Sequence, residues 1–194
     1  FVPRLGIFPE VMFAISEITS KPFDAHLMVN DPLEVLAWIK DVKNLKYVSF
    51  HISDHKSKMY YIADKIKEND LLPIAAIDLS TDFSELKKVV EEKIFFGLLF
   101  MGIHPGVLRQ THRPEIVKKN LDDLKKIYQF DNDDFLIQCD GGVNFDSLSL
   151  LSNAGINNFV CGTSTLYKGV NSLKSEEKNQ KICENICLIK KLIG

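Results

Sequence analysis

Short apolar segments alternate with longer amphipathic segments from one end of the chain to the other. Several of the short segments are apolar at nearly every position, which is typical of strands buried on both faces of a parallel sheet. The longer segments repeat apolar residues at helical spacing. This alternation predicts parallel strands joined by crossover helices. The predicted strands are Phe23 to Met28, Tyr47 to Ile52, Leu72 to Asp78, Phe95 to Ile103, Phe135 to Asp140 and Asn157 to Cys161.

Local signals mark where several helices begin. Asp31 followed by Pro32 offers an N-cap and a first-turn proline, and Asp82 with Glu85 has the spacing of a capping box. Asn144 is a further candidate N-cap, after the strand that ends in an aspartate. These signals support helices in the segments between the strands.

The first and last helices flank the series of strands. One helix is predicted from about Pro9 to Ile18, and another from about Glu177 to Leu192 closes the chain. The segment Ser172 to Gln180 is polar enough to be a mobile loop. The first helix carries an apolar stripe of Val11, Met12, Ile15 and Ile18.

About six strands alternating with helices are compatible with an open doubly wound sheet or with a closed barrel. Polar residues help to choose, because five of them lie at or just after the carboxyl end of a predicted strand. In a barrel these ends converge on one face, where active sites are built. The five residues are His26, His51, Asp78, His104 and Asp140.

The composition indicates a globular domain with a small-molecule partner. At 194 residues, with 45% hydrophobic and 26% charged side chains, the chain can bury a substantial core, and we expect a single domain over residues 1–194. A formal net charge of −2 argues against nucleic-acid binding, which requires a basic surface. The chain lacks a long uncharged apolar segment and a secretion leader, so we expect neither a membrane partner nor export.

The four cysteines lie late in the chain, without the CxxC pairs of a zinc or disulfide framework. We interpret them as reduced thiols of a cytoplasmic protein. Cys183 and Cys187 share a helical face, for which packing of small apolar groups is the favoured interpretation and metal binding the alternative.

A histidine lies in the first predicted strand. Side chains alternate with period two, so the segment Phe23 to Val29 places Asp24, His26 and Met28 on one face. A histidine in an apolar strand is more often a hydrogen-bonded core residue than a metal ligand. The same interpretation applies to His51.

The segment Ile137 to Asn144 has the pattern of an anion-binding turn. An apolar strand leads into Asp140, Gly141 and Gly142 allow close approach of the backbone, and a helix then begins. The N–H groups at a helix N-terminus attract phosphate, whereas the alternative interpretation is a tight turn. A second glycine-hydroxyl turn, Gly162 to Ser164, follows one β/α unit later, and paired phosphate loops recur in barrels.

These segments resemble successive motifs of the ribulose-phosphate 3-epimerase family, in the same order and with similar spacing. The similarity begins with FVPRLGIFPEV and DAHLMV, continues through SFHIS and LLFMGIHPGVLRQ, and ends with QCDGGVNFDSLSLLSNAGINNFVCGTSTL. It spans nearly the whole chain. The resemblance implies an α/β fold of the TIM (β/α)8 barrel class, of the ribulose-phosphate-binding type.

The resemblance also implies an activity, the epimerisation at C3 of a ketose phosphate, D-ribulose 5-phosphate to D-xylulose 5-phosphate, in the pentose phosphate pathway. In the family a divalent metal ion, variously iron, zinc or manganese, polarises the ketose carbonyl, and two aspartates exchange a proton on opposite faces of C3. By position, His26 matches a metal-ligand histidine, and Asp140 matches the aspartate that is both ligand and acid/base.

Other positions match residues around the family's substrate. Met28 and Met101 match methionines that line the site, with ordinary core packing as the alternative. The expected partner is therefore a sugar-phosphate substrate, and the chain is compatible with a homo-oligomer. The positions that match the phosphate-contacting backbone are Gly141, Gly142, Gly162 and Thr163.

Two further metal ligands of the family form a His-x-Asp pair just before the segment that here begins at Phe1. They belong to the second barrel strand. We therefore expect the first two strands, roughly 30 to 40 residues of an eight-stranded barrel, to lie in an N-terminal stretch outside this sequence.

Two internal segments depart from the family pattern. In the segment Val107 to Arg109, Leu108 and Arg109 replace two glycines of a glycine-rich turn, which restricts positive φ angles and crowds a backbone phosphate nest. Alternatively, Arg109 binds the phosphate through its guanidinium. Asp78 and Leu79 stand where the family has Asn-Pro.

Several functions stay open on this evidence. An epimerase acting on another ketose phosphate, such as allulose 6-phosphate, fits the same motifs. A non-catalytic barrel paralogue that binds a sugar phosphate or a protein partner is the alternative from another class. A decarboxylase or aldolase relative is disfavoured, because no lysine lies at a strand end and the DxKxxD signature is absent.

Overall fold

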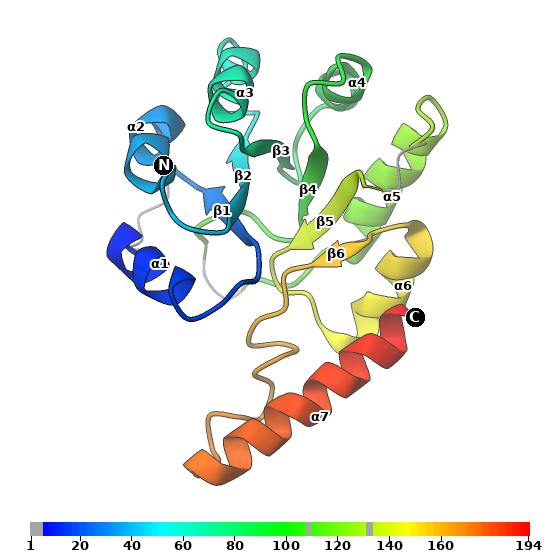
Figure 1. Ribbon diagram of the computed structural model, residues 1–194. Helices are drawn as coiled ribbons and strands as arrows, with labels where there is room; N and C mark the ends of the chain where they lie inside the picture. Colours follow the sequence, from blue (N-terminus) through cyan, green and yellow to red (C-terminus); the bar gives the residue numbers. More distant parts are fainter. Residues whose placement is uncertain (1–5, 108–109, 131–133) are drawn as a thin grey trace.

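The computed structural model describes residues 6–107, 110–130 and 134–194, and its strands form one sheet flanked by helices (Figure 1). The strands are β1 (Phe23–Leu27), β2 (Leu45–His51), β3 (Leu72–Ile77), β4 (Gly97–Met101), β5 (Leu136–Asp140) and β6 (Asn158–Phe159). The helices are α1 (Pro9–Ser16), α2 (Pro32–Ile39), α3 (Met59–Lys67), α4 (Phe83–Glu91), α5 (Pro114–Lys125), α6 (Phe145–Ala154) and α7 (Ser175–Ile193).

The strands follow one another in the sheet in chain order, from β1 to β6, and every neighbouring pair is parallel. A doubly wound sheet would instead reverse its strand order at a switch point. The sequential order therefore excludes that alternative and agrees with the wall of a barrel.

Contacts across the sheet show that it is curled. In a flat sheet the four spacings from β1 to β5 would amount to about 19 Å. Nevertheless, His26 Nδ1 of β1 lies 3.2 Å from Asp140 Oδ2 of β5, and Gln138 Nε2 of β5 donates a hydrogen bond to Asp24 Oδ2 of β1 at 2.8 Å. The described part of the chain thus forms six adjacent strands of a barrel-like parallel sheet, with the side chains of β1 and β5 meeting on its inner face.

The apolar residues form two layers, one on each face of the sheet. All five residues of β4 are buried. Leu98 and Phe100 join the core between the sheet and the helices, whereas Leu99 faces the opposite way and packs with Ile74 and Ala76 inside the curl. This arrangement explains why the strands are apolar at successive positions rather than at alternate ones.

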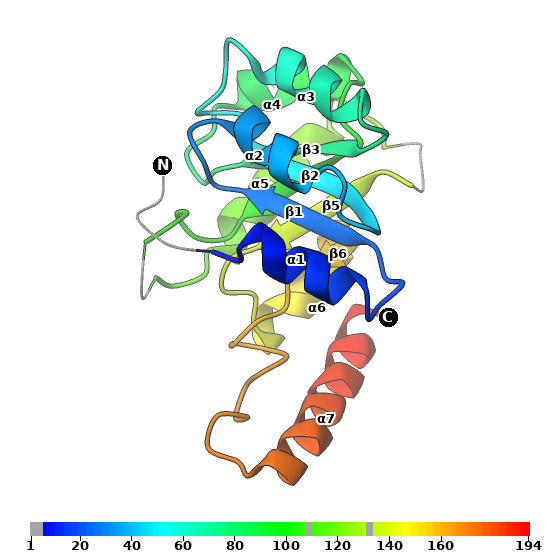
Figure 2. The same ribbon diagram turned by 60° about the vertical axis from the view of Figure 1, so that its left-hand side comes forward.

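The helices cover the outer side of the curled sheet. In Figure 1, α2 to α6 surround the strands, and in both views α1 lies on the β1 side. Helix α7 runs away from the sheet and meets α6 near the C-terminus (Figure 2), where Ser149 Oγ donates a hydrogen bond to the Leu192 carbonyl at 3.0 Å.

The predicted strands are all confirmed, and β6, with two residues, is the shortest. Three predicted N-caps are also confirmed, because each side chain accepts at least one hydrogen bond from a backbone N–H group of the first helical turn. They are Asp31, Asp82 and Asn144.

One expectation about the end helices is wrong. Most of the segment predicted as a mobile loop is helical, because α7 begins at Ser175; there the Glu177 carboxylate accepts a hydrogen bond from the Lys174 backbone N–H at 3.1 Å. In α1, Met12 packs against the core, but Val11 and Ile15 are exposed. The helix ends at Ser16, and of these three residues of its apolar stripe only Met12 contacts the core.

Candidate active site

Four polar side chains form a row of close polar contacts at the carboxyl end of the sheet. His26 lies in β1, His51 and Asp140 are the last residues of β2 and β5, and Asp78 directly follows β3. Asp140 Oδ2 is 3.2 Å from His26 Nδ1, and His26 Nε2 is 2.9 Å from His51 Nε2. His51 Nδ1 is in turn 2.9 Å from Asp78 Oδ1. We call this set the polar row.

The two histidine rings of the polar row meet edge to edge. Their planes differ by 17°, their centroids are 5.0 Å apart, and their Nε2 atoms are separated by 2.9 Å. Rings lying face to face would keep their atoms about 3.5 Å or more apart. The contact is therefore an N–H···N hydrogen bond in which one histidine donates and the other accepts.

The exposed fraction of the side chains decreases from the Asp140 end of the polar row to His51 in its middle. The side chain of Asp140 is 22% exposed and that of His26 is 16% exposed, whereas the side chain of His51 is fully buried. A small molecule can therefore approach Asp140 and His26. His51 does not face the solvent, so it can affect a bound molecule only through neighbouring residues.

The Asp78 end of the row is a carboxylate. Burial by itself would raise the pKa of Asp78, but hydrogen bonds from His51 and Ser53 outweigh burial and hold the pKa below its usual value, with a smaller contribution from His104. Ser53 Oγ donates to Asp78 Oδ2 at 2.5 Å, and the Asp78 backbone N–H donates to Thr81 Oγ1 at 2.9 Å. Asp78 is thus ionised and held in place from several sides.

The exposed end of the row fits a divalent metal ion. An imidazole nitrogen and a carboxylate oxygen are ligands that zinc, iron and manganese accept. Two ligands bonded at about 2.1 Å to one ion lie about 3 Å apart, and His26 Nδ1 and Asp140 Oδ2 are separated by 3.2 Å. The donor types and their separation therefore suit two neighbouring ligands of one ion.

A second group of donors lies at the other end of the row. One ligand atom each from His51, Asp54 and Asp78 lies within 4.8 Å of the others. Asp54 is exposed, and His51 already shares its two nitrogens with Asp78 and His26. This second group is the alternative place for a cation.

The two predicted phosphate turns both lie at the carboxyl end of the sheet. Gly141 and Gly142, directly after β5, have φ angles of +99° and +72°, which glycine adopts at little cost. The N-terminus of α6, capped by Asn144, follows them. After β6, Gly162 and Thr163 are exposed, and a Cβ at Gly162 would meet nothing within 4 Å.

Comparison with known protein families identifies the family of this chain. The model of the ribulose-phosphate 3 epimerase family matches residues 1–166, most of the chain. The chain belongs to the ribulose-phosphate 3 epimerase family.

Curated relatives agree with the family assignment. The chain is 26% identical over 179 residues to a ribulose-phosphate 3-epimerase of Methanocaldococcus jannaschii, a match that covers 92% of this chain and 73% of the relative. It is 29% identical over 185 residues to the enzyme of the same name from Buchnera aphidicola, covering 95% and 78%. A relative from Oryza sativa, the "Ribulose-phosphate 3-epimerase, cytoplasmic isoform", is 27% identical over 165 residues, covering 84% and 70%.

Solved structures support the fold alone. A 3-hexulose-6-phosphate synthase from Salmonella typhimurium superposes with a TM-score of 0.58 at 15% identity, over 91% of this chain and 81% of that one. A thiamine phosphate pyrophosphorylase from Pyrococcus furiosus superposes with a TM-score of 0.57 at 13% identity, over 97% and 81%.

The remaining predicted residues of this family member lie near the polar row. Met101 ends β4, is buried, and pairs in register with Asp140, whereas Met28 directly follows β1 and is half-buried. Gln110 bridges the loop after β4: its amide donates to the carbonyls of His104 and Val107 at 2.6 and 3.0 Å. The substituted residues Leu108 and Arg109 lie outside the described residues.

Two residues that support the site were missed by sequence reasoning. His112 lies beneath the first glycine turn, where its Nδ1 donates to the Gly141 carbonyl at 2.7 Å, and Ser53 binds Asp78. Neither ends a strand, so the pattern of polar residues at strand ends did not mark them. Their proximity to the site depends on loops that return toward it.

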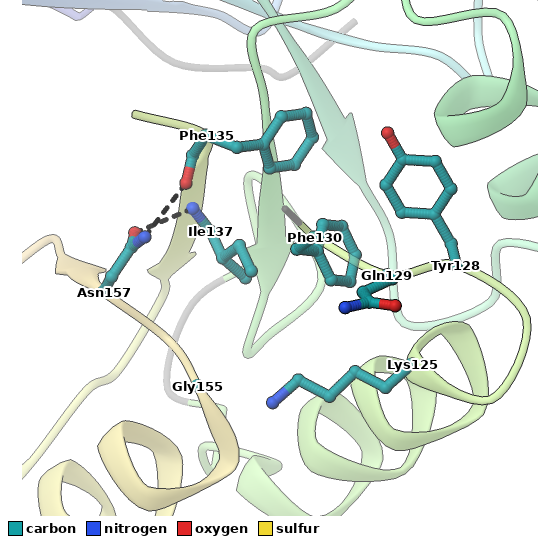
Figure 3. A pocket seen from close by; sticks show the side chains of 8 residues that line it. All are labelled: Lys125, Tyr128, Gln129, Phe130, Phe135, Ile137, Gly155 and Asn157. Atoms are coloured by element: carbon teal, nitrogen blue, oxygen red, sulfur yellow. Dashed lines mark hydrogen bonds between the residues drawn. The ribbon is translucent and has the colours of Figure 1, made fainter. Parts of the chain in front are cut away.

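A separate pocket of about 530 Å³ lies at the opposite, amino end of the strands, where Ile137 is the second residue of β5 and Asn157 directly precedes β6 (Figure 3). Asn157 accepts a hydrogen bond from the Ile137 N–H and donates one to the Phe135 carbonyl. Barrel enzymes place catalytic groups at the carboxyl end, and the amino end serves stability. We therefore assign this pocket to packing between the sheet, α5 and α6.

Proposed function

We propose that this protein interconverts D-ribulose 5-phosphate and D-xylulose 5-phosphate by moving the proton at C3, within the pentose phosphate pathway. The observation that carries the proposal is the placement of Asp140 beside His26 at the accessible end of the polar row, in a member of the ribulose-phosphate 3 epimerase family. Asp140 is an accessible, ionisable carboxylate that His26 holds in place. Such a positioned carboxylate is a suitable acid/base for a carbon-bound proton.

In this proposal each predicted residue has a defined role. His26 and Asp140 hold one divalent ion, iron, zinc or manganese, which when bound polarises the ketose carbonyl. Asp140 takes or returns the C3 proton on one face of the sugar, and a second acid, the other aspartate that the family resemblance implies, acts on the opposite face. Met28 and Met101 line the substrate, and the turns at Gly141–Gly142 and Gly162–Thr163 bind the phosphate through backbone N–H groups.

The proposed location follows from the relatives. Among the described residues, no helix combines the length and the apolar character needed to cross a membrane. One curated relative is named a cytoplasmic isoform, and we propose the same compartment for this protein.

Exchange of the C3 proton tests the proposed reaction. Protein reconstituted with Mn²⁺, Fe²⁺ or Zn²⁺ is incubated with ribulose 5-phosphate in deuterated water, and NMR follows deuterium at C3. We expect exchange in the unmodified protein and a loss of about 10² to 10⁴ in rate in Asp140→Asn, because positioned acid/base groups contribute factors of this size.

Asp24→Asn is a matched control, because Asp24 also faces the inside of the curl and is hydrogen-bonded to Ser49 and Gln138 rather than to the polar row. It should retain exchange within a few-fold. If the unmodified protein bound the sugar phosphate but exchanged no C3 proton with any of the three metals, the protein would be a binding paralogue rather than an epimerase.

A further inference from the structure

The inference that follows rests on the proposed function, in which His26 is a metal ligand. We infer that His51, anchored by Asp78, is a positioning residue that fixes the tautomer of His26 and turns its unprotonated Nδ1 toward Asp140 and the metal site. The observations that carry it are the two hydrogen bonds on either side of His51 and its complete burial.

The direction of the hydrogen bonds follows from the carboxylate at the Asp78 end. An ionised carboxylate only accepts hydrogen bonds, so His51 Nδ1 carries the hydrogen that it shares with Asp78. In neutral His51 the Nε2 atom is then an acceptor. The hydrogen in the 2.9 Å contact between the two Nε2 atoms therefore belongs to His26.

This direction determines which nitrogen of His26 is available to a cation. When Nε2 of neutral His26 carries the hydrogen, Nδ1 has a free lone pair. Nδ1 lies 3.2 Å from Asp140 Oδ2, so a lone pair and a carboxylate oxygen face one another. Two such groups repel each other unless a cation lies between them and binds both.

The anchor of the row is rigid. Asp78 is fixed by Ser53 Oγ through its second carboxylate oxygen and by Thr81 through its backbone N–H. His51 is fully buried, so bulk water does not replace its contacts. A histidine ligand usually donates its other N–H to a carboxylate, directly or through another group, and this contact raises its basicity toward the metal.

Asp78 allows a conservative test of the row, because an asparagine has nearly the same shape as an aspartate. An asparagine can accept the His51 hydrogen bond, but its amide also offers donors and carries no charge. With Asp78, the acceptor at the end of the row is unambiguous. The substitution Asp78→Asn therefore isolates the effect of the carboxylate on the metal site.

The experiment measures Co²⁺ binding, which the proposal predicts to depend on a residue that does not touch the ion. The protein and the variants Asp78→Asn, Asp54→Asn and Asp140→Asn are titrated with Co²⁺, and calorimetry gives the affinity while the visible absorption spectrum reports the ligand field. Circular dichroism confirms that each variant is folded. None of these readings requires turnover of a substrate.

We expect Asp78→Asn to weaken Co²⁺ binding measurably, up to the roughly 10- to 100-fold loss that follows removal of a direct outer contact of a metal-ligating histidine, because Asp78 acts on His26 through His51. Asp140→Asn should abolish tight binding. Asp54→Asn is the matched control, because Asp54 is the other carboxylate near His51 but is exposed and is not one of the two proposed ligands, and it should leave affinity and spectrum unchanged.

Three results would overturn the inference. Unchanged affinity in Asp78→Asn would show that His51 and Asp78 do not position His26. Absence of Co²⁺ binding to the unmodified protein would show that His26 and Asp140 do not form a metal site. A loss in Asp54→Asn with no loss in Asp140→Asn would place the ion among His51, Asp54 and Asp78 instead. The proposed function fails separately: a protein that shows the expected Co²⁺ pattern but exchanges no C3 proton has the metal site without the epimerase activity.

Discussion

At the scale of single residues, His26 combines the two interpretations that its sequence context offers. It is hydrogen-bonded within a strand, as a core histidine would be, but its Nδ1 lies beside Asp140 at the accessible end of the row. The two roles do not conflict, because a histidine has two nitrogens with different partners. The nitrogen toward His51 orients the ring, and the nitrogen toward Asp140 is the one we assign to the metal.

The cysteines provide a prediction at the same scale. Cys183 and Cys187 are exposed, so the expectation that they pack among apolar groups is wrong. Burial, with a smaller effect of the Asp140 charge, raises the pKa of Cys139 to about 12, and burial also raises the pKa of Cys161. Because the thiolate is the reactive form, we expect iodoacetamide at pH 8 to modify Cys183 and Cys187 first and Cys139 last.

Peptide mapping by mass spectrometry after short reaction times measures this order. Protein unfolded in urea is the control, and in it all four cysteines should react at similar rates. Early modification of Cys139 in the folded protein would contradict its burial.

At the scale of elements, the start of α6 links local sequence to the candidate phosphate turn. Asn144 accepts hydrogen bonds from the backbone N–H groups of Asp146 and Ser147, and the Ser147 hydroxyl lies 3.2 Å from the Asn144 N–H. The reciprocal contacts hold the helix start directly after Gly141 and Gly142. A helix N-terminus in this position has a fixed direction toward the carboxyl end of the sheet.

Removal of this cap should lower the free energy of unfolding. We expect Asn144→Ala to cost about 1 kcal/mol, because the first-turn N–H groups lose their acceptor, and Asn144→Gly to cost only a few tenths of that amount. Urea unfolding monitored by circular dichroism gives both values. Equal losses in the two variants would indicate that the side chain acts through packing rather than as a cap.

At the scale of the whole molecule, the curl of the sheet creates the site. The polar row draws on β1, β2, β5 and the segment after β3, so no pair of sequential elements contains it. Below this row, Asp24 of β1 is hydrogen-bonded to Ser49 and Gln138. Two successive layers of polar contacts therefore join strands that a flat sheet would keep apart.

Acid should weaken the whole fold through His112. Burial lowers the pKa of His112, so the folded protein keeps it neutral while the unfolded chain takes up a proton near its ordinary pKa of 6.5. The stability contributed by neutral His112 is thus complete above pH 6.5 and is lost as the pH falls from 6.5 toward the folded pKa. We expect His112→Asn to show a flatter decline of unfolding free energy between pH 7.5 and about pH 5.

Urea unfolding at a series of pH values, with a chelator present to exclude metal effects, measures the two curves. The difference between them isolates His112 from the other histidines. Parallel curves would mean that His112 is equally easy to protonate in both states.

The sequence by itself determined the order of strands and helices, because apolar spacing and capping residues act over a few neighbours. Local sequence was sufficient to predict the six strands and the polar residues at their ends. It was also sufficient to predict the helix caps at Asp31, Asp82 and Asn144. The motifs DAHLMV and DGGV also indicated the family that the comparisons then showed.

Only the tertiary structure decided which polar residues meet. His26 and Asp140 are far apart in the chain, and their contact depends on how strongly the sheet curls between β1 and β5. The same holds for the edge-to-edge contact of His26 with His51, which converts an ordinary buried histidine into the anchor of the proposed metal ligand. Periodicity specifies the face on which a side chain lies, but distances across a sheet depend on the twist and closure of all its strands together.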